Sequence, residues 1–177
     1  METHLPDSES AAGKPGGETA INSMMKDEFL LVKNYIDKID IHGTSENFEY
    51  DFCPFLQNIL DTFTTKQQED FIKEIFKSGD PYLYFIARFL DFTDYDLKGR
   101  YESSYVFCEC FSKIERVEYL ECLYDNLELH LMQRKFFKNS LILPLEDIVN
   151  NLYLLINHLK DENSIDHCLK IIDNLDD

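Results

Sequence analysis

Basic residues are scarce in this sequence of 177 residues, in which 17 lysines and arginines face 34 aspartates and glutamates, for a formal net charge of −17. Affinity for nucleic acids comes mainly from lysine and arginine side chains that displace counterions from phosphates, so this composition argues against nucleic-acid binding. Anionic membrane surfaces are disfavoured for the same reason. A protein partner with a basic patch is what such an acidic chain complements best.

Long apolar runs are also missing. No stretch approaches the about 20 apolar residues that a membrane-spanning helix needs, and residues 1–20 lack the basic and apolar regions of a secretory signal. The cysteines are odd in number and follow no regular spacing, which favours reduced thiols on apolar helix faces over a disulfide framework. They are Cys53, Cys108, Cys110, Cys122 and Cys168. We therefore expect a cytoplasmic or nuclear protein.

Motifs for nucleotide, metal or hydrolytic chemistry are absent: the sequence contains no GxxxxGK[ST], GxGxxG, HExxH or GxSxG. Cys108 and Cys110 lie two residues apart, and on a helix they point about 200° from one another, so they cannot hold one ion. His167 and Cys168 diverge by about 100° and cannot form a base–nucleophile pair with each other. His130 has no partner readable in the sequence. We expect no catalytic residue, metal or cofactor.

Glycine and proline are few, with six and five residues, which favours long helices over a turn-rich β-sandwich. Apolar residues recur at intervals of three and four along most of the chain, the period of an amphipathic helix. No segment shows the sustained alternation of apolar and polar residues that indicates a half-buried strand. The sequence therefore predicts an all-α fold with eight or nine helices joined by short links.

Two arrangements of these helices are compatible with the pattern. Tight corners between helices, and the prolines Pro54, Pro81 and Pro144 early in helices, favour a short stack of helix pairs of the HEAT and armadillo kind. These prolines are 27 and 63 residues apart, which is no fixed repeat, and a globular helical bundle remains the alternative.

Composition divides the chain into two parts. Residues 1–22 are rich in serine, glycine, proline, alanine and glutamate and show no apolar period, so we expect a disordered acidic tail. Residues 23–177 carry the helical pattern and are expected to form a single all-α domain.

Aromatic residues crowd the segment 82–105, where they are mixed with aspartates. Tyr82, Tyr84 and Phe85 cover a wide arc of one helix, so they cannot all face a single core. Either some of the aromatics are exposed and contact a partner, or the helix is packed between two neighbours. On the first interpretation, the expected contact residues are Tyr84, Tyr95 and Tyr101, with Asp94 and Asp96 attracting a basic group.

These observations favour a non-catalytic protein–protein interaction module, an adaptor or regulatory subunit whose partner presents a basic or apolar surface. A self-contained helical regulator or inhibitor of viral or host-defence type, with a hydrophobic groove for a partner's helix, is the alternative. An enzyme of an unfamiliar helical kind is the third hypothesis, and a buried cluster of converging polar side chains would favour it.

Overall fold

The structure is a computed structural model that describes the backbone of residues 16–39, 48–133 and 141–175, with side chains from Met25 onward within these ranges. Residues 1–15 of the expected tail lie outside the described part. The backbone of residues 16–22, also assigned to the tail, belongs to the first helix, which begins at Gly16.

Helices account for all regular structure in the described residues, so the predicted all-α fold class is confirmed. Eight α-helices and one short π-helical turn, η1, are present in these ranges, without a strand. No helix in the same ranges is both long and apolar enough to cross a membrane. The elements are α1 (Gly16–Lys38), η1 (Phe48–Phe52), α3 (Cys53–Thr62), α4 (Thr65–Ser78), α5 (Tyr82–Phe92), α6 (Ser103–Lys113), α7 (Val117–Met132), α8 (Leu145–His158) and α9 (Glu162–Leu175).

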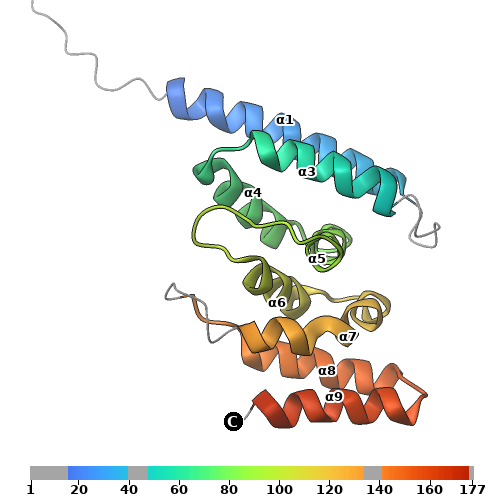
Figure 1. The fold of residues 1–177 in the computed structure, drawn as a ribbon. Helices are drawn as coiled ribbons and strands as arrows, with labels where there is room; N and C mark the ends of the chain where they lie inside the picture. Colours follow the sequence, from blue (N-terminus) through green and yellow to red (C-terminus); the bar gives the residue numbers. More distant parts are fainter. Residues whose placement is uncertain (1–15, 40–47, 134–140, 176–177) are drawn as a thin grey trace, which may run out of the picture.

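The helices form an open stack. They follow one another along the molecule broadly in sequence order, with α1 at one end and α9 at the other (Figure 1). Extensive packing joins α5 to α6, α6 to α7, α7 to α8, and α8 to α9. Of the two expected arrangements the stack describes the molecule, since a closed bundle would bring the first and last helices around one shared core.

Helix α5 explains the crowding of aromatic residues. Seven of its 11 residues are buried, because it is packed between helices from both sides. The Tyr84 ring stacks on Tyr119 of α7 with centroids 4.5 Å apart, while the neighbouring Phe85 ring meets Phe52 of η1 at 5.7 Å. A helix in the middle of a stack needs apolar side chains around most of its circumference. The second interpretation of the aromatic segment therefore fits the structure.

The start of α4 has a capping box one residue earlier than the spacing of Thr65 and Gln68 suggests. Thr64 Oγ1 accepts a hydrogen bond from the Gln67 N–H at 3.2 Å, and Gln67 Oε1 accepts one from the Thr64 N–H at 2.8 Å. At its other end, α4 closes at Gly79, whose φ of 74° is a conformation that favours glycine.

Asp80 binds backbone groups of a segment that is distant in the sequence. The pattern Asp80-Pro81 predicts a cap for α5, but Asp80 Oδ2 accepts hydrogen bonds from the backbone N–H groups of Glu115 and Arg116, both at 3.0 Å. The spacing of Ser112 and Glu115 predicts a capping box, but the Ser112 hydroxyl donates to the Glu109 carbonyl at 2.7 Å instead. The carboxylate thus fixes the α4–α5 corner to the start of α7.

Gln68 is the buried polar residue of the core, only 1% exposed. Its Nε2 donates to the Leu60 carbonyl at 2.9 Å, and its Oε1 accepts from the Lys98 N–H at 2.6 Å. One amide therefore satisfies two backbone groups and holds the loop 93–102 against the α3–α4 corner.

Replacing Gln68 with methionine is expected to lower the free energy of unfolding by about 2 kcal/mol. Methionine keeps the volume but leaves the Leu60 carbonyl and the Lys98 N–H without their partner. Urea unfolding followed by circular dichroism measures the effect. The matched control is Gln57→Met at an exposed position of α3, which should change stability by less than about 0.5 kcal/mol. Equal effects of the two variants would contradict the assigned hydrogen bonds.

Candidate functional site

Two of the three tyrosines expected at a partner surface belong to the core. Tyr84 is 3% exposed, and its hydroxyl accepts a hydrogen bond from Arg88 Nη1 at 3.1 Å. Tyr101 is buried as well, with its ring 6.2 Å from that of Phe76. The interpretation of these two rings as exposed is wrong, because α7 packs against Tyr84, and side chains of α4 and α6 pack against Tyr101.

The other three expected contact residues lie in the loop 93–102. Tyr95 is half-buried, and its hydroxyl donates to Asp61 Oδ1 at 2.9 Å, so its ring lies against the α3–α4 corner. Burial, with the hydrogen bond to Asp61, raises the pKa of Tyr95 to about 12. Asp94 and Asp96 are exposed. The five residues do not form one exposed patch, and whether Asp94 and Asp96 contact a partner stays a prediction.

The thiols divide into one exposed and four buried side chains. Cys122 is exposed on α7, which corrects the expectation that every cysteine lies in the apolar core. Burial raises the pKa of Cys53 and of Cys168 to about 11, and raises that of Cys110 further. Buried thiols with raised pKa values stay protonated at neutral pH and are poor nucleophiles.

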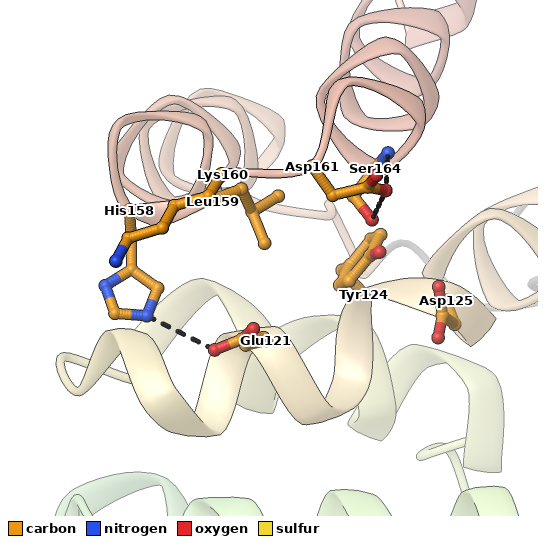
Figure 2. A pocket seen from close by; sticks show the side chains of 8 residues that line it. All are labelled: Glu121, Tyr124, Asp125, His158, Leu159, Lys160, Asp161 and Ser164. Atoms are coloured by element: carbon orange, nitrogen blue, oxygen red, sulfur yellow. Dashed lines mark hydrogen bonds and ion pairs between the residues drawn. The ribbon is translucent and has the colours of Figure 1, made fainter.

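A pocket of about 540 Å³ opens between α7 and the corner that joins α8 to α9 (Figure 2). Helix α7 supplies its floor, and the short link between the two last helices supplies its rim. The lining is polar and charged apart from one leucine. It consists of Glu121, Tyr124, Asp125, His158, Leu159, Lys160, Asp161 and Ser164.

Carboxylates dominate one side of the pocket. Asp161 and Asp125 lie on the same side as Tyr124 in Figure 2. The Asp161 carboxylate is fixed, because its Oδ2 accepts hydrogen bonds from the Ser164 N–H at 3.0 Å and the Ser164 hydroxyl at 2.9 Å. This arrangement makes Asp161 the cap of α9.

The opposite side of the pocket carries its basic residues. His158 Nε2 lies 3.2 Å from Glu121 Oε2, which links α8 to α7 across the cavity (Figure 2). Lys160 follows on the exposed link. The lining contains three carboxylates against one lysine and one histidine, so the pocket is acidic on balance.

Tyr124 is the buried aromatic residue of the pocket, 7% exposed. Burial, with the nearby Asp125 carboxylate, raises the pKa of its phenol, so the ring is neutral in the physiological range. A neutral phenol ring beside carboxylates attracts cations through both its electron-rich face and the adjacent charges.

The pocket suits an organic cation better than a metal ion. No group of three or more His, Cys, Asp and Glu side chains in the described ranges is arranged to hold a metal. A guanidinium or ammonium group needs no such ring of ligands, because it is bound by separate hydrogen bonds to carboxylates.

Sequence reasoning missed this pocket. Its two walls come from segments more than 30 residues apart, as the separation of 37 between Glu121 and His158 shows. From the sequence alone, Asp161 belongs to a solvated link between helices, and Tyr124 belongs to the apolar face of a helix. No spacing of three or four residues relates these two positions.

Comparisons with known proteins assign the chain to no family: no family model matches it, and neither a curated protein nor a solved structure is significantly similar to it.

Proposed function

We propose that this chain is a protein–protein interaction module, an adaptor or regulatory subunit that binds a basic segment of a partner protein in the pocket between α7 and the α8–α9 corner. The observation that carries the proposal is the set of three carboxylates around a buried tyrosine in one cavity. Carboxylates beside a phenol ring suit the binding of a cation, and no group of three or more His, Cys, Asp and Glu side chains in the described residues could hold a metal here.

The charge and shape of the pocket support an arginine or lysine side chain as its occupant. Asp161 is held by Ser164 before any partner arrives, so little conformational entropy is lost when a guanidinium binds to it. The Tyr124 ring lines the same pocket, and a cation in contact with its face would gain about 0.5–2 kcal/mol. The net charge of −17 steers a basic partner toward the whole molecule, which raises the association rate.

The open stack supports the adaptor over the self-contained regulator. A stack presents an extended surface formed by successive helices, whereas a regulator for a partner's helix needs an apolar groove. The pocket between α7 and the α8–α9 corner is lined mainly by polar and charged residues and is not such an apolar groove. The proposal places the protein in the cytoplasm or nucleus, where buried thiols remain reduced.

Reversing the charge of the pocket is expected to weaken binding of a fluorescent hexa-arginine peptide at least tenfold. The variant is Glu121→Lys with Asp125→Lys, since neither residue caps a helix and both are exposed. Fluorescence anisotropy at low ionic strength measures Kd, and titration with salt tests the electrostatic origin. The loss of the exposed Glu121–His158 ion pair should cost little stability, so the melting point serves as the folding control.

The matched control is Asp94→Lys with Asp96→Lys, which makes the same change in net charge on the loop 93–102. This variant should change Kd by less than about threefold, because only long-range attraction is altered. Equal weakening in both variants would contradict a pocket site and indicate general electrostatic attraction. Weakening only in the loop variant would place the basic partner on Asp94 and Asp96, as the sequence pattern suggests.

A further inference from the structure

A second polar cluster, which shares no residue with the pocket, joins α5, α6 and α7. His130 of α7 lies between Ser104 in the first turn of α6 and Asp91 near the end of α5. Its Nδ1 is 3.1 Å from Ser104 Oγ, and its Nε2 is 3.1 Å from Asp91 Oδ1. A hydroxyl, an imidazole and a carboxylate are thus connected in series, the arrangement that recurs in serine hydrolases of unrelated folds.

The hydrogen bonds determine which nitrogen of His130 carries the proton. An ionised carboxylate only accepts hydrogen bonds, so the nitrogen that faces Asp91 must be the donor Nε2–H. Nδ1 then carries a lone pair and accepts the proton of the Ser104 hydroxyl. The two nitrogens exchange roles relative to the serine proteases, but either one can serve as the base.

Neighbouring residues hold this cluster in place. Asn126 Nδ2 donates to Asp91 Oδ2 at 2.5 Å, which fixes the carboxylate from its other side. The His130 ring stacks on Phe107 with centroids 3.9 Å apart, which restricts its rotation. A base held by a third group and packed against an aromatic ring needs little reorganisation to accept a proton.

We propose that Ser104 is the nucleophile and His130 the general base of an ester-hydrolysing site, with Asp91 as a positioning residue. This activity goes beyond the proposed binding function and does not depend on it. The substrate class is carboxylic esters, because a hydroxyl, an imidazole and a carboxylate connected in series are the groups that acyl transfer to a serine requires.

The reaction balances with water as the second substrate. Ser104 Oγ forms a bond to the ester carbonyl carbon while its proton passes to His130 Nδ1. The carbon–alkoxide bond then breaks, and the alkoxide takes that proton and leaves as the alcohol. A water molecule, giving its proton to the same nitrogen, adds to the acyl group on Ser104. The acid is released as Oγ recovers the proton.

The proposal assigns stabilisation of the developing oxyanion to the start of α6. Ser104 belongs to the first turn of α6, where the first helical hydrogen bond runs from the Val106 N–H to the Glu102 carbonyl at 3.0 Å. The N–H groups of Ser103 and Ser104 precede that bond, and the first N–H groups of a helix, which have no partner within the helix, are suited to a negative oxygen.

The test is covalent labelling of the folded full-length chain with a fluorophosphonate, in which the serine oxygen bonds to phosphorus and fluoride leaves. Intact mass and peptide mapping should find one adduct, on Ser104. Ser104→Ala should abolish it. The matched control is Ser103→Ala in the adjacent position, whose hydroxyl donates to the Tyr95 carbonyl at 2.7 Å, and it should label at the wild-type rate.

The heat-unfolded chain provides a second control and should label at least tenfold more slowly than the folded chain. Hydrolysis of p-nitrophenyl acetate should follow the same order among the variants. The absence of an adduct on the folded wild type, or equal labelling of Ser103 and Ser104, would overturn the proposal. The cluster would then be only a set of hydrogen bonds that ties three helices together.

Asp91→Asn tests the positioning role. The Asn126 amide needs an oxygen partner, so the introduced asparagine would present its oxygen there and its NH₂ group to His130 Nε2. The ring would change to the Nδ1–H form, which cannot accept the Ser104 proton. We expect labelling to fall at least tenfold, with the change of tautomer visible in the ¹⁵N NMR spectrum of His130. A changed tautomer with unchanged labelling would exclude His130 as the base.

Discussion

Replacing Tyr84 with alanine is expected to lower the free energy of unfolding by about 3 kcal/mol or more. The ring is nearly completely buried and stacks on Tyr119 at 4.5 Å, so its removal leaves a large cavity between α5 and α7. Truncation of a large buried aromatic residue typically costs about 3–5 kcal/mol. The hydrogen bond from Arg88 to the Tyr84 hydroxyl is lost in addition.

Urea unfolding measures this loss, with two variants as controls. Tyr84→Phe keeps the ring and removes only the hydroxyl, so it should cost about 1 kcal/mol. Tyr50→Ala removes a ring that is 74% exposed and should change stability by less than about 0.5 kcal/mol. A Tyr84→Ala protein that is as stable as the wild type but binds a basic peptide tenfold more weakly would support the interpretation of Tyr84 as a contact residue.

Raising the pH from 9 to 12 is expected to destabilise the protein steeply. Cys53 and Cys168 have ordinary pKa values of 9.0, which burial raises to about 11 in the folded state. Above pH 9 the unfolded chain therefore loses thiol protons that the folded chain retains, and the stability of the folded state falls as pH rises toward 11. A difference of two pKa units corresponds to about 3 kcal/mol for one such group. Burial raises the pKa values of Tyr95 and Tyr105 to about 12, so these two tyrosines extend the loss of stability above pH 10.

Urea midpoints at pH 7, 9, 10 and 11 in the presence of a reductant measure this dependence. The contribution of the two buried thiols to the stability of the folded state should be fully present below pH 9. The double variant Cys53→Ala with Cys168→Ala lowers the midpoint at pH 7 through lost packing, but its midpoint should fall less between pH 9 and 11. If the urea midpoints of the variant and the wild type fell equally between pH 9 and 11, these thiols would not be the cause of the loss of stability at alkaline pH.

The apolar period alone was sufficient to predict the all-α class, because it depends only on which residues follow each other along a helix. The end of α4 follows from residue type, since Gly79 adopts a positive φ that other residues avoid. The hydrogen-bond partners of residues near helix ends could not be predicted from the local sequence. Asp80 has the residue type of a helix cap, yet its carboxylate accepts hydrogen bonds from the link before α7 and not from the helix that follows it.

The choice between exposed and buried aromatics depended on tertiary structure. In the sequence, Tyr84 and Phe85 are equally compatible with an exposed binding surface and with a central helix that is buried on both sides. Sequence spacing gives the direction of a side chain on its helix, but it does not show what covers that side chain. The stack placed α7 over one ring and η1 over the other. Composition gave the acidic character of the chain, but not the place where carboxylates converge.

Both candidate sites are made by contacts between segments distant in the sequence. Glu121 meets His158 across 37 residues, and His130 meets Asp91 across 39 and Ser104 across 26. Helical periodicity reports neighbours three or four residues apart, so His130 appeared to be without a partner. The sequence by itself determined the helices and the net charge. Only the packing of α5, α6 and α7 determined which hydroxyl, imidazole and carboxylate lie together, because hydrogen bonds between helices depend on their relative position in space.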